Sequence, residues 1–307
     1  MSEIVKVRHL SYTYASGSAY ERKALNDISF SVDRGEFLGI FGPNGSGKST
    51  LAQHLNGLIR PVKGTVIVCG LDASDPRTSR DLWKKVGLVF QYPEHQIFQT
   101  SVYDEVAYGP RNLGLPEAEV QERTYEALRE VGLTPENIVK VNPVTLSGGM
   151  RRRVAIAGIL AIRPEILILD EPMAGLDAAG RKLILDIIRQ RQERHETTIM
   201  ISHDLKEVLS TADRIAVLDR GCLSFFGYVS ALLDEPEILA RYQFDLPEYL
   251  QVVFALAAKG VDIRRDIKNI EEAAREIVRL LNESGRLPLS RGKLMKARRK
   301  EGFLTGT

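Results

Sequence analysis

The sequence contains very little cysteine and lacks any long hydrophobic run. Its two cysteines, Cys69 and Cys222, are far apart and show no metal-binding spacing, which excludes a disulfide framework and a cysteine-based metal site. No apolar run approaches the roughly 18–20 residues that a membrane-spanning helix needs. The first residues lack the apolar core of a signal peptide. We therefore expect a cytosolic protein that reaches a membrane only through a partner or by its surface.

An excess of charge of one sign is also absent. The 42 Lys and Arg residues nearly balance the 40 Asp and Glu residues, and this balance does not indicate a nucleic-acid partner. The length of 307 residues, with 44% hydrophobic and 27% charged residues, predicts one large or two unequal globular domains. Because the composition changes near residue 230, we expect a domain over 1–229 and a C-terminal helical extension with a basic tail over 230–307.

The clearest motif is a glycine-rich run over residues 42–50, Gly-Pro-Asn-Gly-Ser-Gly-Lys-Ser-Thr. It follows a strand-like run and precedes a helix-like run, which is the context of a Walker A phosphate loop. Backbone N–H groups in such a loop bind phosphate. Lys48 can reach the β- and γ-phosphates, and Ser49 can bind Mg²⁺. The expected nucleotide-binding residues of the loop are Gly42, Asn44, Gly45, Ser46, Gly47, Lys48, Ser49 and Thr50.

Acidic residues and a histidine follow two further strand-like runs. Asp170 ends the apolar run 165–170, which is typical of a central strand in a parallel sheet, and Glu171 follows it directly. Functional groups gather at the carboxyl ends of such strands. We therefore expect Asp170 to hold Mg²⁺ and Glu171 to activate water for attack on the γ-phosphate. His203 follows the β-branched run 197–202 and can donate a hydrogen bond to that phosphate.

A second glycine-rich helix start, Leu-Ser-Gly-Gly-Met, covers residues 146–150. Ser147 can cap the helix, and Gly148 and Gly149 expose backbone at its positive dipole end. One nucleotide phosphate does not need two such sites in one chain. We therefore expect this site to face a nucleotide held by another subunit.

The hydrophobic pattern predicts an α/β fold that turns helical from about 101 to 163, and we expect a helical subdomain at about 92–163. Strands are expected over 4–10, 28–32, 37–41, 64–70, 86–90, 165–170, 197–202 and 215–218. Helices are expected over 51–58, 116–131, 151–162 and 180–194.

The C-terminal extension is expected to contain two short amphipathic helices, the first capped by Asp245. Their expected apolar faces are Leu246, Leu250, Val253, Phe254 and Ala257, then Ile270, Ala274, Ile277 and Leu281. The tail over 286–307 carries seven Lys or Arg against one acid. Two interpretations stay open, a solvated segment and one attracted to anionic lipid headgroups.

Taken in order, the motifs resemble the nucleotide-binding subunit of ATP-binding cassette proteins over about residues 4–228. The set comprises Walker A at 42–50, the Q-loop at Gln91, the signature at 146–150, Walker B at 166–171, the D-loop at 174–177 and the H-switch at His203. The resemblance implies a P-loop NTPase core of the ATP-binding cassette type, with an antiparallel β portion and a helical subdomain. It also implies an ATPase that uses ATP and Mg²⁺.

The resemblance further implies individual roles. Tyr14 stacks on adenine, although a strand-edge aromatic is the alternative, and Asp177 belongs to the D-loop. The implied catalytic residues are Lys48, Gln91, Glu171 and His203, and the implied Mg²⁺ ligands are Ser49, Gln91 and Asp170. The signature residues Leu146, Ser147, Gly148, Gly149 and Met150 contact the ATP held by the partner chain.

Finer features resemble the ATPases of energy-coupling factor importers of vitamins or metal ions. They are the runs 90–96, 106–110 and 152–158, and Leu246-Pro247. This resemblance implies a dimer with a second ATPase, either a paralogue or the same chain. It also implies a transmembrane coupling protein, a substrate-binding membrane subunit, no nucleic-acid partner, and a peripheral place on the cytoplasmic face of the cell membrane. The alternative is the ATPase subunit of another ATP-binding cassette importer.

Some details extend or depart from the family pattern. Glu94, Asp104 and Glu105 lie close to Gln91 in sequence and are candidates for docking the coupling protein. The signature usually ends in glutamine, where this chain has Met150, so we expect the composite site to support hydrolysis more weakly. Met173 replaces a commoner threonine, and we have no functional account of it.

Overall fold

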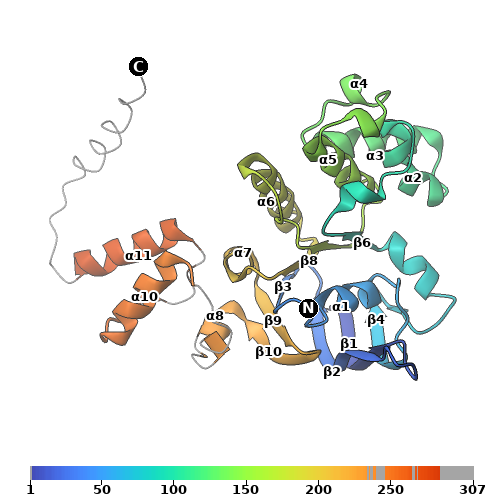
Figure 1. The fold of residues 1–307 in the computed structure, drawn as a ribbon. Helices are drawn as coiled ribbons and strands as arrows, with labels where there is room; N and C mark the ends of the chain where they lie inside the picture. Colours follow the sequence, from blue (N-terminus) through green and yellow to red (C-terminus); the bar gives the residue numbers. More distant parts are fainter. Residues whose placement is uncertain are drawn as a thin grey trace, which may run out of the picture. The chain divides into compact units, whose positions relative to one another are not determined.

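The computed structural model describes residues 2–233, 235, 238–239, 246–264, 267 and 269–283 (Figure 1). The chain divides into two compact units, Met1–Phe244 and Asp245–Thr307. This division lies beyond the boundary expected at 229/230, because helix α8 (Val229–Leu233) still packs against the last strands of the first unit. The two units are described separately below.

A large, mainly parallel sheet forms the centre of the first unit. Within the described residues its strand order is β10-β9-β3-β8-β7-β6, and only β10 and β9 pair antiparallel. The strands are β3 (Phe37–Phe41), β6 (Val86–Val89), β7 (Ile166–Asp170), β8 (Thr197–Ser202), β9 (Arg214–Asp219) and β10 (Cys222–Tyr228). Every residue of β3, β6, β7 and β8 is buried, as expected for parallel strands covered on both faces. The predicted α/β class is therefore confirmed.

A smaller antiparallel sheet lies over helix α1 and the large sheet. Its order is β2-β1-β4-β5, and the strands are β1 (Glu3–Tyr14), β2 (Arg22–Asp33), β4 (Lys63–Val68) and β5 (Leu71–Asp72). Val5, Val7 and Phe30 are buried on its inner face, while alternate residues face solvent. This is the antiparallel portion that the sequence predicted.

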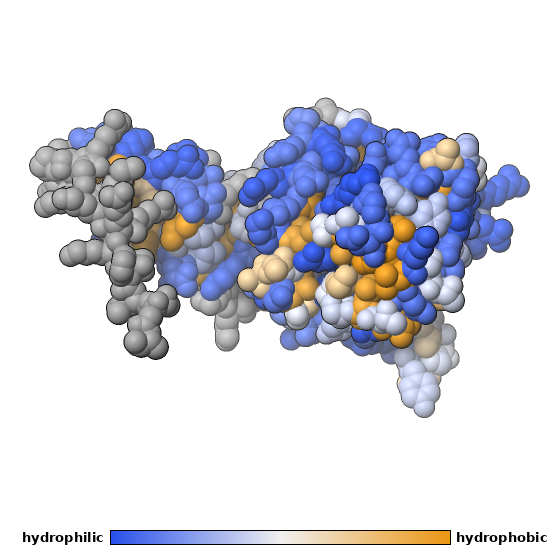
Figure 2. All heavy atoms as spheres, turned by 90° about the horizontal axis from the view of Figure 1, so that it is seen from above, coloured by the Kyte–Doolittle hydropathy of each residue, from blue (hydrophilic) through white to orange (hydrophobic). Residues whose placement is uncertain are grey.

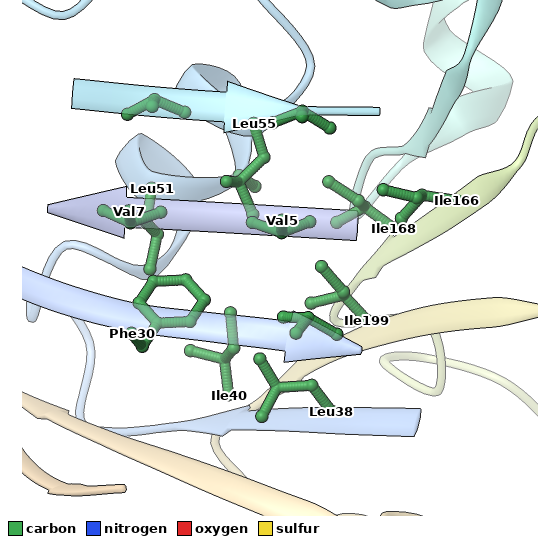
Figure 3. Packing of buried hydrophobic residues seen from close by; sticks show 14 of the residues in the cluster. Val5, Val7, Phe30, Leu38, Ile40, Leu51, Leu55, Ile166, Ile168 and Ile199 are labelled. Carbon is green, nitrogen blue, oxygen red and sulfur yellow. The ribbon is translucent and has the colours of Figure 1, made fainter. Parts of the chain in front are cut away.

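The hydrophobic core lies between the two sheets (Figure 3). Figure 3 shows side chains from both sheets and from α1 (Lys48–Leu55) meeting in one interior, among them Phe30, Ile40, Leu51 and Ile168. Full burial of each such side chain stabilises the fold by about 1.5–3 kcal/mol. Helix α1 is thus fixed against both sheets, and the loop that precedes it is fixed with it.

Two further helices pack on the large sheet. Helix α6 (Ala178–Glu193) buries Ile184, Ile187 and Ile188 at helical spacing, as the sequence predicted. Helix α7 (Leu205–Thr211) approaches β3 so closely that a Cβ on Gly39 would lie 2.1 Å from Cγ1 of Val208. A side chain at position 39 would therefore push the helix away from the strand that leads into the glycine-rich loop.

The helical subdomain lies between β6 and β7, and Figure 1 shows its helices grouped together. Its elements are η2 (Pro93–Gln96), α2 (Val102–Asn112), α3 (Glu117–Glu130), α4 (Pro135–Ile138), η3 (Pro143–Thr145) and α5 (Gly148–Leu160), and the turn η1 (Ser79–Lys84) precedes β6. Ser101 caps α2 and Ser147 caps α5, each through its side-chain oxygen. The Ser147 cap had been predicted.

The second unit contains α10 (Glu248–Ala258) and α11 (Ile270–Glu283), which contact each other. Leu250 and Val253 are buried on α10, as expected. The predicted face of α11 is only partly right: Ile277 and Leu281 are half-buried, but Ile270 and Ala274 are exposed while Ala273 and Glu276 are buried. A glutamate that binds Arg279 therefore occupies the inner face instead of an apolar residue. The predicted cap Asp245 and the basic tail lie outside the described residues.

The surface of the first unit is mostly hydrophilic, with apolar residues showing mainly in one area of the face drawn in Figure 2. Tyr92, Phe98 and Tyr108 are among its exposed large hydrophobic residues. Across the described part of the chain, no helix has the length and apolar character that crossing a membrane requires.

Candidate functional site

The glycine-rich loop leaves the buried strand β3 and enters α1 at Lys48, three residues before the predicted start of the helix at 51. Gly47 immediately precedes the helix with a φ of +105°, and a Cβ there would lie 2.5 Å from the carbonyl oxygen of Ala24. Only glycine fits this position, because it tolerates the backbone angle and leaves room for the neighbouring strand. The backbone N–H groups at the start of α1 consequently face the open side of the loop.

The ammonium of Lys48 is held at the mouth of this loop. Its Nζ donates hydrogen bonds to the carbonyl oxygens of Gly42 at 2.7 Å and Pro43 at 3.1 Å. Burial lowers the pKa of Lys48, while the nearby carboxylates of Glu171 and Asp170 raise it. The cation is thus partly desolvated, which strengthens its attraction for an anion entering the loop.

Asp170 ends β7 with a carboxylate that is only partly satisfied. Burial raises the pKa of Asp170, and a hydrogen bond from Ser49 lowers it. Its Oδ1 is buried and has no hydrogen-bond partner among the described residues. An unpaired buried carboxylate oxygen beside the Ser49 hydroxyl and the Gln91 amide forms an oxygen donor set that fits Mg²⁺.

Glu171 and His203 meet directly across two neighbouring strands. Oε2 of Glu171 lies 2.6 Å from Nδ1 of His203. The N–H of Glu171 donates to the carbonyl oxygen of Ile201 at 2.9 Å. Glu171 has a φ of +51°, a left-handed conformation that costs a residue other than glycine about 1–3 kcal/mol. Such strain at a strand end is typical of a functional position.

Tyr14 lies at the edge of the same pocket and is fixed by its neighbours. Its hydroxyl lies 3.1 Å from Oγ1 of Thr50, and its ring packs edge-on against Tyr12 at 4.9 Å between centroids. Tyr12 in turn packs edge-on against His54 at 4.8 Å. Tyr14 as a whole is 37% exposed, which leaves it accessible to a stacked base.

Arg22 is a pocket residue that the sequence analysis missed. It is the direct cross-strand partner of Tyr14, and a Cβ on Gly45 would lie 3.0 Å from its Nη2. Its guanidinium therefore lies over the glycine-rich loop, where it adds a second positive charge near Lys48. The β1–β2 register that creates this neighbour follows a bulged hairpin with a long loop, and no motif indicates that register.

Together these groups line one pocket of about 250 Å³ at the carboxyl ends of β3, β8, β7 and β6. It brings together predicted residues that are far apart in sequence: Tyr14, Asn44, Gly45, Gly47, Lys48, Ser49, Thr50, Gln91, Asp170, Glu171 and His203. Gly42 and Ser46 belong to the loop beneath and are buried. The sheet order explains the assembly, because β8 lies between β3 and β7 and brings His203 between their ends.

The signature residues lie in a different pocket. Ser147, Gly149, Met150 and Asp177 line a separate pocket of about 440 Å³. Asp177 caps α6 by accepting a hydrogen bond from the N–H of Gly180 at 2.7 Å. Leu146 and Gly148 adjoin this pocket in sequence without lining it. One chain therefore carries a phosphate loop and a signature that do not share a pocket.

We expect His54 to make stability fall below about pH 6.5. Its Nδ1–H donates to the carbonyl oxygen of Thr50 at 2.7 Å, which leaves the fully buried Nε2 unprotonated and without a partner among the described residues. Burial lowers the pKa of His54 from its ordinary value of 6.5. As pH falls below 6.5 the unfolded chain binds this proton first, so the stability present above 6.5 is progressively lost.

Thermal unfolding between pH 7 and pH 5 tests this prediction. The melting temperature of the wild type should fall more steeply than that of His54→Asn, whose amide retains a donor toward Thr50. His195→Asn, at an exposed histidine, should follow the wild type. Parallel curves for wild type and His54→Asn would contradict the prediction.

Comparison with known protein families and sequences gives consistent matches. The family described as ABC transporter matches residues 25–174. The energy-coupling factor transporter ATP-binding protein EcfA2 of Caldanaerobacter subterraneus subsp. tengcongensis is 46% identical over 279 residues, which cover 90% of this chain and 97% of that protein. The protein of the same name from Clostridium acetobutylicum is 42% identical over 285 residues, covering 92% and 99%.

Two solved structures are similar to this chain in fold and sequence. One is cbiO1 from Clostridium perfringens, described as part of the ABC transporter complex cbiONQ. It is 34% identical with a TM-score of 0.66, covering 81% of this chain and 97% of that one. The other is a dimeric ATP-binding cassette in a post-hydrolysis state, bound to ADP and Pi. It is 29% identical with a TM-score of 0.65, covering 73% and 98%.

Proposed function

This chain belongs to the energy-coupling factor transporter ATP-binding proteins, and from that premise we propose that it works as one of two ATPase subunits whose closure on ATP drives import. Hydrolysis of ATP is the activity of its family. The observation that carries the proposal is the pocket at the strand ends, where Lys48, Asp170, Glu171 and His203 surround the glycine-rich loop. The transported solute is a vitamin or metal ion, as the resemblance implies.

Within the pocket we assign the following roles. The loop backbone and Lys48 bind the phosphates, and Tyr14 stacks on adenine. Ser49, Gln91 and Asp170 hold Mg²⁺, which supplies charge neutralisation of the phosphate oxygens when it is bound. Glu171 accepts the proton of the attacking water, and His203 holds the Glu171 carboxylate through the 2.6 Å contact. The contact with His203 therefore orients the Glu171 carboxylate at the edge of the nucleotide site.

The separation of the two glycine-rich helix starts supports a composite site. Each ATP lies between the phosphate loop of one chain and the signature of the other, with Ser147 and the backbone of Gly149 as anion contacts. Binding of ATP closes the pair, and hydrolysis with product release reopens it. The second ATPase subunit is either a paralogue or a second copy of this chain.

The membrane partners are a transmembrane coupling protein and a substrate-binding subunit, on the cytoplasmic face. Among the three candidate docking acids, Asp104 and Glu105 are engaged within the chain. Asp104 binds Arg111 at 2.9 Å, and Glu105 accepts hydrogen bonds from the N–H groups of Phe98 and Gln99. Glu94 is half-buried and its Oε2 is buried, so the exposed aromatic rings of Tyr92, Phe98 and Tyr108 are the better candidates for this contact.

Purification of the tagged chain from membranes tests the proposal. We expect a second ATPase chain and membrane proteins to co-purify, with ATP hydrolysis in the purified complex. Recovery of the chain without membrane proteins would contradict the transport role.

For single-residue tests we define a single-site complex, in which the second, differently tagged ATPase chain carries methionine at its own phosphate-loop lysine. Only the composite site on this chain's loop is then active.

We expect Met150→Gln to raise hydrolysis by about two- to tenfold at the composite site that uses this signature, because an amide can restore a polar contact to ATP. Met150 is 37% exposed and its side chain is apolar. The measurement uses a complex silenced at the other site by Lys48→Met in this chain. Leu185→Gln, at an exposed apolar residue of α6, is the control and should change nothing. Lower turnover in Met150→Gln would contradict the account.

A further inference from the structure

Arg152 is a buried arginine that the assigned roles leave unused. It lies on α5, two residues after the signature, and only 6% of it is exposed. Burial lowers the pKa of Arg152, whereas the nearby Glu94 and Tyr92 raise it. Arginine remains charged in proteins, so the fold keeps a cation in its interior between the helical subdomain and β7. A buried cation of this kind needs a specific set of acceptors.

The acceptors of Arg152 belong to the turn that begins at Glu171. Its Nη2 donates to the carbonyl oxygen of Pro172 at 2.7 Å, and its Nη1 donates to that of Ala174 at 3.1 Å. The turn is closed by the N–H of Ala174, which donates to the carbonyl oxygen of Glu171 at 3.2 Å. One guanidinium therefore fixes two carbonyl groups within three residues of the catalytic carboxylate.

The conformation of Glu171 explains why this turn needs support. Its φ of +51° is unfavourable for a glutamate and persists only where the surroundings enforce it. On one side the N–H of Glu171 is held by Ile201 of β8. On the other side the backbone that follows is held by Arg152. The orientation of the carboxylate thus depends on a side chain from the helical subdomain.

Glu94, in the segment after Gln91, acts on the same arginine through its charge, which raises the pKa of Arg152. Helix α5 packs against η2, which carries Glu94. Oε2 of Glu94 and Nε of Arg152 are both buried, and neither has a hydrogen-bond partner among the described residues. The Glu94 carboxylate and the Arg152 guanidinium therefore carry opposite charges on two packed elements, and each has one buried polar atom without a partner among the described residues. The Glu94 carboxylate helps to keep the Arg152 cation in place.

We propose that Arg152 is a positioning residue for hydrolysis. It ties the turn after Glu171 to the signature helix α5. The orientation of the Glu171 carboxylate therefore depends on the position of the helical subdomain. This inference rests on the proposed role of Glu171. Lysine cannot replace the arginine, because one ammonium does not form the two directed bonds that the planar guanidinium forms.

The test compares Arg152→Lys and Arg152→Gln in the full single-site complex. We expect kcat for ATP hydrolysis to fall about 10- to 100-fold in both, because a misplaced catalytic group costs rate. The KM for ATP should stay within about twofold, because Arg152 lines the signature pocket and not the pocket on this chain's loop, which is the active one in this complex. Arg163→Gln is the matched control. It removes an arginine just after α5 whose ion pair with Glu126 is exposed, and kcat should not change.

The double variant Arg152→Gln/Glu171→Gln separates positioning from any other effect. If Arg152 acts through Glu171, the double variant is no slower than Glu171→Gln alone. A further loss in the double variant, an unchanged kcat in the single variants, or a rise in KM alone would each overturn the proposal. If Arg152→Gln does not assemble, Arg152→Lys, which keeps the charge, decides by the same criteria. Absence of hydrolysis in the parent complex would instead refute the proposed function.

Discussion

Replacing Glu171 by glutamine is expected to lower ATP hydrolysis in the single-site complex by about 10²–10⁴-fold, the usual contribution of a general base. Glutamine keeps the size of the side chain and can still bond to His203, but it cannot accept the proton of water at neutral pH. ATP binding should persist, because Glu171 lies beside the phosphate loop and is not part of it. The variant should therefore hold ATP and keep the ATPase pair closed.

Rapid-quench measurement of phosphate release, with bound ATP counted separately, checks this result. Glu165→Gln is a suitable control, because Glu165 directly precedes the same strand and forms ion pairs with Lys85 and Arg34 away from the pocket. It should leave hydrolysis unchanged. Fast turnover in Glu171→Gln would refute the assigned role of this residue.

Replacing Lys48 by methionine is expected to reduce hydrolysis in the single-site complex to background, a loss of at least about 10²–10³-fold. The ammonium is the buried cation nearest to the phosphate position, and it also counters the charges of Asp170 and Glu171. Folding should be little affected. Methionine fills a similar volume, and water can replace the ammonium at the exposed Pro43, so only the bond to the buried carbonyl oxygen of Gly42 is lost.

Hydrolysis rate, ATP affinity and melting temperature together test this prediction. Lys182→Met provides the comparison, since Lys182 is exposed on α6 and forms only a surface ion pair with Asp186. Both variants should melt close to the wild type, and only Lys48→Met should lose activity. A large drop in melting temperature for Lys48→Met would mean that the lysine is mainly structural.

Much of the core followed from local sequence patterns. The runs over 37–41, 165–170 and 197–202 are continuous and apolar, and each forms a strand close to its predicted bounds. Strand β10 was not predicted, because its residues are only half-buried and include Ser224 and Gly227, which weaken the strand pattern. The face of α11 was partly misassigned because Glu276, paired with the exposed Arg279, takes a buried position that apolar spacing cannot indicate.

In the candidate site too, residues that belong to a local sequence motif could be predicted, and residues placed by contacts distant in sequence could not. Motif residues such as Lys48 and Asp170 could be predicted because loop chemistry and strand ends are visible in sequence. Arg22 and Arg152 could not, because their partners depend on β1–β2 register and on subdomain packing. Asp104 and Glu105 were close to Gln91 in sequence, yet their hydrogen bonds inside the subdomain were not foreseeable from spacing.

The complete burial of β8 has a consequence for how His203 is aligned. A strand that is apolar on both faces can slip by one residue without exposing hydrophobic surface, so its hydrophobic pattern does not define its register. Polar residues at the ends of the strand must define the register instead. Oγ1 of Thr197 accepts from the N–H of Gly35 at 2.9 Å, and the Ser202 hydroxyl donates to Glu207 at 2.8 Å. The hydroxyl groups of Thr197 and Ser202 thus help to fix the alignment of the histidine at the end of a strand whose interior is fully buried.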